Sequence, residues 1–402
     1  MVFLQIVVTY SVSHSTFAPM HLEKIILTNF KNYANQTLVF DLQFNAFVGL
    51  NGVGKTNLLD AIYYLCMCKS YFLSSDSDTI LRGADFMRLE GIFKKNSSEE
   101  KIAAKVQPRK KKIFERHDVP YSALSEHIGL IPIVMIAPDD TELIKEGSEE
   151  RRRFLDNTLS QLDKNYLNHL IFYNRVLEQR NSLLKKYANN EGGQSQELDS
   201  LLGIYEIQLL PAARYIFQKR HQFIQEFEPI FNETYQKISG AKESVKIVFD
   251  SQLNSILTKK EGVDTSELNL WLASRAKDKI LQRTTFGIHR DDLGFEMGDK
   301  SVKKFGSQGQ LKSFVIALKL AQYEILRGSK FEQPILLLDD IFDKLDEERV
   351  NNLLQLIVSQ SYGQVFITDT HEERIKAIFE TTSIHYKLFQ VASGQVQALT
   401  LI

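Results

Sequence analysis

Residues 49–56 read GLNGVGKT, which has the spacing G-x-x-x-x-G-K-[ST] of loops that bind the phosphates of a nucleotide. Glycines let such a loop turn tightly and point its N–H groups at phosphate oxygens. We expect Lys55 to reach the terminal phosphates and the Thr56 hydroxyl to bind Mg²⁺. The alternative is a glycine turn without a ligand. The residues predicted to contact the nucleotide here are Gly49, Leu50, Asn51, Gly52, Val53, Gly54, Lys55, Thr56 and Asn57.

Two acids, Asp339 and Asp340, end the apolar run ILLL at residues 335–338. A buried strand that ends in two carboxylates needs a reason, because unpaired buried charge is costly. We expect Asp339 to bind Mg²⁺. We expect Asp340 to orient or activate a water for attack on the γ-phosphate, which makes Asp340 and Lys55 the candidate catalytic residues. The alternative is a pair of aspartates that cap a helix.

The third candidate segment is FGSQGQ at residues 305–310, directly before an amphipathic pattern over residues 308–327. A serine at a helix start offers donors to an anion, although it is also a common cap. The segment resembles the signature sequence of ABC-type ATPases, with Gln308 where glycine is usual. In that class the signature contacts the γ-phosphate held by a second subunit. The resemblance implies nucleotide contacts from Ser307, Gln308, Gly309 and Gln310.

The elements around these segments fit the same class. FNAFVG (44–49) is typical of a strand leading into the loop, and residues 58–69 predict an amphipathic helix. QVFIT (364–368) repeats the pattern of a strand that is buried on both faces. FDKLD (342–346) resembles a D-loop. This order of motifs is that of ABC-type ATPases, which hydrolyse ATP between two head-to-tail heads.

The pattern between the loop and the signature changes from strands, over residues 88–136, to helices, over residues 140–279. We therefore predict an α/β fold: an ABC-type ATPase head of the P-loop NTPase class, with a helical second lobe formed by an insertion. Helices are expected at 151–164, 166–187 and 271–282. The predicted parts are a disordered N-terminal extension at 1–19, head segments at 20–136 and 286–402, and a mainly helical lobe at 137–285.

The 402-residue chain has a formal net charge of −1, so DNA contacts would have to come from local basic patches. The run at residues 109–112 is either a solvated hairpin tip or such a contact. The arginines at 151–153 either face solvent or pair with acids of the preceding segment, namely Asp139, Asp140 or Glu142.

Cysteine use and hydropathy indicate the compartment. Cys66 and Cys68 are expected to be packing residues, and so few cysteines fit a reducing cytoplasm. No apolar run is long enough to span a bilayer. Residues 2–8 are apolar, but no lysine or arginine precedes Lys24, unlike in a secretory signal. We therefore expect a cytoplasmic protein with no membrane partner.

Four segments resemble the RecF family of bacterial recombination mediators, and they extend from Met20 nearly to the end of the chain. They are LTNFKNY (27–33), NGVGKTNLLDAIYYL (51–65), IAPDDTELIKEGSEERRRFLD (136–156) and FGIHRDDL (286–293). SMC and Rad50 proteins share the heads, but they need long coiled coils, for which this chain has no heptad run. Lys31 stands where the family usually has arginine and is implied as a nucleotide contact. Ile288 stands where proline is usual.

Three positions remain open within this resemblance. Residues 138–140 occupy the place of the Q-loop glutamine of other ABC ATPases. His371, in FITDTHEE (366–373), is either a γ-phosphate sensor or a surface residue. The residues from His289 to Asp292 form either an ion-paired turn or a functional contact.

The resemblance implies an ATP-dependent homodimer that requires Mg²⁺ and clamps DNA. It implies binding to single-stranded DNA and to junctions of single strands with duplexes at gaps. It further implies cooperation with RecR and RecO in loading RecA, support of recombinational repair and the SOS response, and slow ATP hydrolysis that resets the clamp. The rival interpretations are a nucleotide-binding subunit of another ABC-type system, such as a transporter, and an ATP-dependent scaffold that does not hydrolyse ATP.

Overall fold

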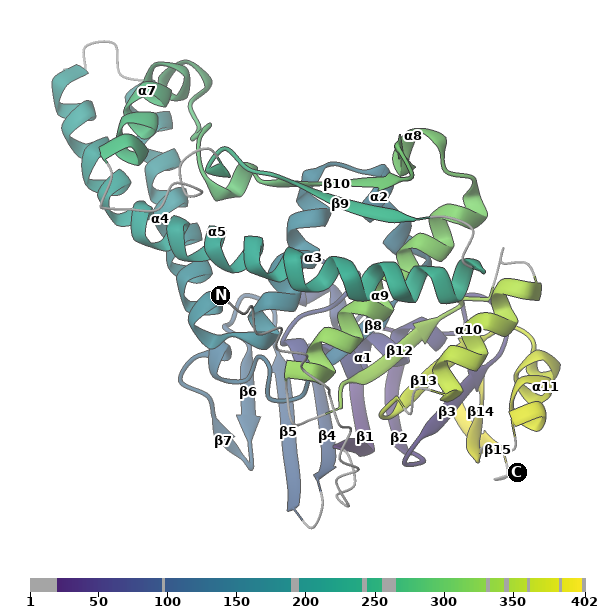
Figure 1. Cartoon of the computed structure of the whole chain (residues 1–402). Helices are drawn as coiled ribbons and strands as arrows, with labels where there is room; N and C mark the ends of the chain where they lie inside the picture. Colours follow the sequence, from purple (N-terminus) through teal and green to yellow (C-terminus); the bar gives the residue numbers. More distant parts are fainter. Residues whose placement is uncertain are drawn as a thin grey trace, which may run out of the picture.

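The computed structural model describes residues 20–95, 98–188, 195–240, 244–254, 265–329, 333–342, 347–359, 362–382 and 385–399. The predicted extension at 1–19 and residues 343–346 of the D-loop-like segment lie outside the described residues. Two six-stranded sheets form the lower part of the molecule, and long helices cross above them (Figure 1).

The central sheet has the strand order β15-β14-β3-β13-β12-β8. All neighbouring pairs are parallel except β14 and β15. Its strands are β3 Phe44–Val48, β8 Ile133–Ile136, β12 Ile335–Asp339, β13 Val365–Asp369, β14 Tyr386–Ala392 and β15 Gln395–Leu399. Strands β3, β13, β12 and β8 are buried at every residue, as their continuous apolar runs require. Because β3 lies between β13 and β14, the two ends of the chain build one sheet.

The second sheet is antiparallel, in the order β2-β1-β4-β5-β6-β7. Its strands are β1 His21–Phe30, β2 Tyr33–Val39, β4 Met87–Lys95, β5 Ser98–Val106, β6 Ile113–Arg116 and β7 Val119–Pro120. The first seven residues of β4 alternate strictly between buried and partly exposed, which is typical of a sheet with one face on a core. That core contains helix α1, Lys55–Met67, and reaches the central sheet. The short helices η1, Asp76–Thr79, and η2, Leu124–Glu126, belong to the connections of this region.

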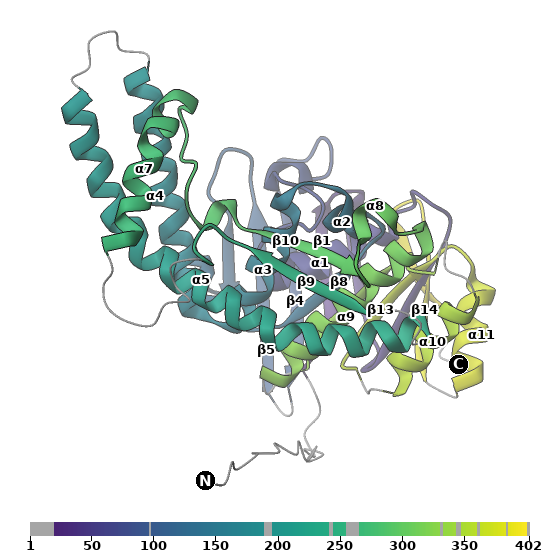
Figure 2. The same ribbon diagram turned by 45° about the horizontal axis from the view of Figure 1, so that its top comes forward.

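The helical lobe consists of α3 Ser148–Leu162, α4 Lys164–Ala188, α5 Ser195–Ser239 and α7 Thr265–Leu281. Figures 1 and 2 show α4, α7 and the start of α5 projecting away from the sheets. Buried Arg180 of α4 fastens this arm, because it pairs with Glu206 of α5 and Asp278 of α7 at 2.9 and 2.8 Å. Strand β9, Val245–Asp250, also falls in the segment predicted as mainly helical. It pairs with β10, Asp292–Met297, which in turn pairs with β11, Lys300–Ser301.

The remaining helices lie in the other connections of the chain. They are η3 Pro138–Thr141, α2 Glu142–Lys145, η4 Ile288–Arg290, α8 Val302–Phe305, α9 Gln308–Ser329, α10 Glu347–Ser359 and α11 Glu372–Thr382. One apolar core joins α5 and α9 to β12 and β13. Among the described residues, no helix is both long enough and apolar enough to cross a membrane. The architecture confirms the predicted α/β head.

Candidate functional site

The glycine-rich loop connects β3 directly to α1, as its sequence predicts. Gly49 and Gly54 have φ angles of +154° and +116°, which side-chain-bearing residues rarely adopt. A Cβ atom on Gly49 would lie 2.3 Å from the carbonyl oxygen of Val391, and one on Gly54 would lie 2.4 Å from Nδ2 of Asn32. Both glycines are therefore required by the packing of the loop against β14 and the turn between β1 and β2.

Lys55 begins α1 and is buried inside the loop. Its ammonium group donates hydrogen bonds to the carbonyl oxygens of Gly49 and Leu50, at 2.6 and 2.9 Å. Burial lowers the pKa of Lys55. Three carboxylates at the ends of β12 and β13 oppose that shift: Asp340, Asp339 and Asp369.

Asp339 is held by two hydroxyl groups from different elements. Thr56, at the start of α1, donates to both carboxylate oxygens of Asp339, at 3.0 and 2.9 Å. Thr368, in β13, donates to Oδ1 of Asp339 at 2.7 Å. Burial raises the pKa of Asp339, and the two hydroxyl groups oppose the rise. A cation beside this carboxylate would stabilise its charged form.

The donor set at Thr56 and Asp339 fits Mg²⁺. This ion takes oxygen ligands, retains several waters, and in nucleotide sites is held by few protein groups together with phosphates. In the described part of the chain, no group of three or more His, Cys, Asp or Glu side chains could hold a metal ion. A magnesium ion at Thr56 and Asp339 would therefore depend on phosphate oxygens of the nucleotide.

Asp340 differs from Asp339 in position and environment. It is half-buried and has a φ of +46°, and its N–H group donates to Oγ1 of Thr368 at 3.0 Å. Thr368 thus contacts both acids, and sequence reasoning missed it. The signal was its place at the carboxyl end of β13, which is parallel to β12 and in register with Asp339.

The signature-like segment forms the start of α9. Ser307 and Gln310 cap this helix reciprocally: the Ser307 N–H donates to Oε1 of Gln310 at 2.8 Å, and the Gln310 N–H donates to Oγ of Ser307 at 3.3 Å. Ser307 and Gln308 are exposed, whereas Gly309 and Gln310 are half-buried. The exposed residues are available to a group outside this head.

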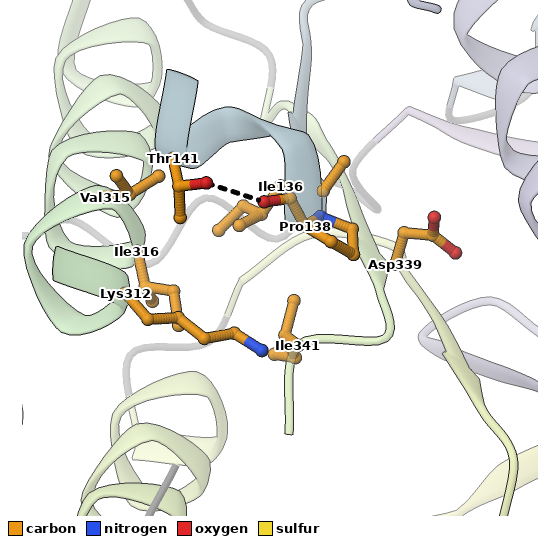
Figure 3. Close-up of a pocket in the computed structure, with 9 residues that line it drawn as sticks. Ile136, Pro138, Thr141, Lys312, Val315, Ile316, Asp339 and Ile341 are labelled. Carbon is orange, nitrogen blue, oxygen red and sulfur yellow. Dashed lines mark hydrogen bonds between the residues drawn. The ribbon is translucent and has the colours of Figure 1, made fainter. Parts of the chain in front are cut away.

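Helix α9 also contacts the end of β12. Figure 3 shows Lys312, Val315 and Ile316 of α9 beside η3, with the carboxylate of Asp339 pointing away from them. The Lys312 ammonium lies 3.5 Å from the carbonyl oxygen of Asp340. The hollow between these elements has a volume of about 10 Å³, which is room for about one water. It is therefore a packing gap and cannot hold a nucleotide.

Lys31 lies next to the loop but points at α1. Its ammonium pairs with buried Asp60 at 2.7 Å, so a nucleotide contact by Lys31 remains a prediction. Its neighbours contact the loop instead. Asn32 donates through Nδ2 to the Val53 carbonyl at 3.1 Å, and the Tyr33 hydroxyl donates to the Gly54 carbonyl at 3.0 Å. Sequence reasoning did not single out these two residues, because they lie outside the loop motif.

The GIHRDDL segment is held by ion pairs. Asp291 pairs with buried Arg220 at 2.7 Å, and the guanidinium of Arg151 contacts both carboxylate oxygens of Asp292, at 2.6 and 3.0 Å. His289 is bonded to the Tyr173 hydroxyl at 2.8 Å. These contacts support the ion-paired turn. Arg290 is exposed.

Of the two alternatives for the arginines at 151–153, pairing with Asp139, Asp140 or Glu142 is not found in the described part of the chain. Arg151 pairs with Asp292, Arg152 donates to the Asp291 carbonyl at 2.8 Å, and Arg153 pairs with Glu149 and Glu150. Asp140, one of the expected acids, instead pairs with Lys319. The helical register of α3 turns Arg151 and Arg152 toward the GIHRDDL turn, which is distant in sequence.

Three further predictions concern the basic run at residues 109–112, His371, and the two cysteines. Arg109, Lys110 and Lys111 are exposed, as expected of a hairpin tip. Lys112 is not part of that solvated tip, because it pairs with Asp76 at 2.8 Å and donates to the Cys68 carbonyl. The side chain of His371 is 66% exposed, so its role as a phosphate sensor stays a prediction. Cys66 and Cys68 are buried free thiols, as predicted.

The family model described as "RecF/RecN/SMC N terminal domain" matches residues 21–395. A DNA replication and repair protein RecF from Flavobacterium johnsoniae is 45% identical over 372 residues, covering 92% of this chain and all of the relative. The chain belongs to the RecF family. A second RecF, from Parabacteroides distasonis, is 43% identical over 94% of this chain and all of the relative.

Solved structures agree with this membership. The recombination mediator protein RecF bound to ATP, in the RecFOR pathway, superposes with a TM-score of 0.83 at 28% identity, covering 96% of this chain and all of that one. An SMC head bound to the C-terminal winged-helix domain of ScpA has a TM-score of 0.54 at 18% identity, covering 94% of this chain and 98% of that one. The second likeness shows that the RecF and SMC heads share one fold.

Proposed function

We propose that this protein is a DNA repair ATPase whose head binds Mg²⁺ and ATP and then forms a head-to-tail homodimer that clamps DNA. The observation that carries the nucleotide part is the meeting of Lys55, Thr56 and Asp339 at one edge of the central sheet. The solved relative bound to ATP supports the same ligand. In this proposal the N–H groups of residues 49–57 cradle the phosphates, and Thr56 and Asp339 hold the magnesium ion.

Exposed apolar residues support the dimer. Leu50, in the loop, is 76% exposed, and Phe305, directly before the signature-like segment, is 67% exposed. A head-to-tail dimer would bring the loop of one head to the signature of the other, and both side chains would leave water. Burying each would contribute about 1.5–3 kcal/mol. ATP between the heads would supply the remaining contacts, through Ser307 to Gln310 of the second head.

Slow hydrolysis is the proposed reset of the clamp. Bound magnesium would supply charge stabilisation at the phosphates. Asp340, half-buried and turned differently from Asp339, would orient or activate the attacking water. Lys55, inside the loop, would neutralise charge on the terminal phosphates.

DNA and the mediator proteins are the proposed partners. The DNA replication and repair role named for RecF relatives, and the RecFOR pathway named for the solved structures, support DNA as a partner. Binding to single-stranded DNA and to junctions at gaps, in the cytoplasm, is the finer part of the proposal. Cooperation with RecR and RecO in loading RecA, and support of the SOS response, belong to the same proposal.

The test is binding of a labelled gapped duplex, measured by fluorescence anisotropy over a salt series with ATP, with ADP and without nucleotide. We expect tight binding only with ATP. We also expect log K to fall steeply with log salt, by about 0.9 per phosphate contacted, because backbone phosphates dominate such contacts. Equal binding in all nucleotide states, or a flat salt response, would contradict the clamp.

A further inference from the structure

A groove opens where the end of α1, η2, α3 and α4 meet, and it shares no lining residue with the nucleotide site. Its volume is about 580 Å³. This size suits a small molecule or a few side chains of a partner. The groove lies at the base of the projecting helical arm, because the residues of α4 that line it come from the first half of that helix.

One wall of the groove carries cations that lack carboxylate partners. The Lys69 ammonium donates to Oδ1 of Asn157 at 2.7 Å, and Nη1 of Arg152 donates to the Asp291 carbonyl at 2.8 Å. Two acids, Glu149 and Asp156, also line the groove, but they pair with Arg153 and Arg220. Within the described chain, neither Lys69 nor Arg152 forms an ion pair with a carboxylate, so each keeps free donors. Burial lowers the pKa of Lys69, the nearby charge of Arg153 lowers it further, and the carboxylate of Asp156 opposes these two effects only in part. An anion beside Lys69 would relieve both effects.

The part of the groove formed by η2, the residues after it, and α4 is mainly aliphatic. Its aliphatic side chains are Leu124, Ile128, Leu167, Leu170 and Ile171. Ile171 is 51% exposed. None of the described residues that line the groove is aromatic, so it offers no platform on which nucleobases could stack. A bare phosphodiester would pair with the cations but leave the aliphatic wall in water. The groove therefore suits a ligand that places an apolar group next to a negative charge.

We propose that this groove binds a short segment of a partner protein in which apolar side chains stand next to carboxylates. The apolar side chains pack on the wall formed by η2 and α4, and the carboxylates accept hydrogen bonds from Lys69 and Arg152. Charge complementarity and the aliphatic wall together favour this occupant over a nucleic acid. This docking function goes beyond nucleotide and DNA binding, and it does not depend on them.

The test uses the full-length protein and a fluorescein-labelled peptide of several aspartates followed by leucine and isoleucine, with anisotropy as the readout. Two control peptides replace the aspartates by lysines or the aliphatic residues by serines. The protein variants are K69Q with R152Q, and, separately, I171E, which places a carboxylate on the aliphatic wall. R175Q is the matched control, because Arg175 is an exposed residue of α4 outside the groove.

We expect the acidic, apolar peptide to bind wild type saturably and both control peptides to bind weakly or not at all. The double variant and I171E should each bind about 10- to 100-fold more weakly, since charge-assisted contacts or apolar burial are lost, while R175Q should match wild type. Binding that persists in the double variant, or no saturable binding of the peptide to wild type, would overturn the proposal. The proposal would also be overturned if the peptide does not bind and a labelled oligonucleotide binds these variants more weakly than wild type. In that case the groove would be a nucleic-acid site.

Discussion

The hydroxyl group of Thr56 donates hydrogen bonds to both carboxylate oxygens of Asp339, although the two residues lie 283 positions apart in the chain. This contact joins the first turn of α1 to the carboxyl end of β12. The fold itself therefore brings together the two oxygen donors that are proposed to hold the magnesium ion. Strands β3, β13 and β12 lie side by side in this order and are parallel. The loop after β3 and Asp339 of β12 therefore meet at the carboxyl ends of the strands.

Thr368 should position both acids. Replacing it with valine removes the donor to Asp339 and the acceptor for the Asp340 N–H group. We expect T368V to lose about 1–3 kcal/mol of unfolding free energy, because buried polar groups lose their partners. Its single-turnover ATP hydrolysis should fall further than its ATP affinity. T368S keeps the hydroxyl and is the control, and equal behaviour of the two variants in urea unfolding and turnover would refute the positioning role.

Asp140 and Lys319 form a buried ion pair, 3.1 Å apart. The Tyr71 hydroxyl donates to Asp140 and accepts from Lys319. K319M leaves Asp140 buried and unpaired, so we expect a loss of about 3–5 kcal/mol in urea unfolding. Adding D140N to K319M should cost less than the sum of the single changes. Strict additivity would show that the two side chains are not coupled. K186M, on the exposed face of α4, should be nearly neutral.

His127 should make stability depend on pH. Burial lowers its pKa to about 4, and its neutral ring donates from Nε2 to the Leu65 carbonyl at 2.7 Å. Its pKa in an unfolded chain is about 6.5, so the unfolded state takes up the proton first as pH falls. The stabilising effect is therefore complete above about pH 6.5 and is lost between about pH 6.5 and 4, by up to ~1.4 kcal/mol per pH unit.

Urea unfolding across this pH range checks the assignment to His127. H127Q keeps a donor for Leu65 but cannot titrate, so its stability should fall less steeply with pH than that of wild type. Burial also lowers the pKa of His289 to about 4, so part of the slope should remain in H127Q. H385Q, at an exposed histidine, is the control. An unchanged slope in H127Q would contradict the burial argument.

Phe305 should contribute to the dimer but not to the isolated head. Its side chain is 67% exposed, so F305S should leave the unfolding free energy of the monomer nearly unchanged. We expect ATP-dependent dimerisation to weaken about 10- to 100-fold, since burial of a phenylalanine contributes about 1.5–3 kcal/mol. Sedimentation equilibrium with ATP measures this constant. Dimerisation at the wild-type level would place Phe305 outside the interface.

The sequence predicts those parts of the site that are formed by short continuous motifs. GLNGVGKT and ILLLDD carry their spacing and flanking strand patterns with them, so the positions of Lys55, Thr56 and Asp339 follow from the sequence. Thr368 could not be found in this way, because a threonine in a buried strand is ordinary. Its role depends on the parallel register of β12 and β13.

Long-range ion pairs explain most of the remaining differences between sequence and structure. Arg151 and Asp292 are 141 positions apart. The sequence pattern alone does not reveal which acid an arginine contacts in the folded chain. The predictions of helices near 151–164, 166–187 and 271–282 succeed, because amphipathic periods are local. Strand β9 was missed, since a single short strand within a helical stretch becomes stable only through its pairing with β10.

The most direct measurement is sedimentation velocity of the full-length protein with and without ATP and Mg²⁺, for wild type, S307R and S98R. Ser98 is an exposed serine at the start of β5 and serves as the matched control. We expect ATP to convert wild type and S98R into dimers, whereas S307R should stay monomeric while still binding ATP. If ATP leaves wild type monomeric, or if S307R dimerises as well as wild type, the start of α9 does not act across a nucleotide-bridged interface and the central claim is contradicted.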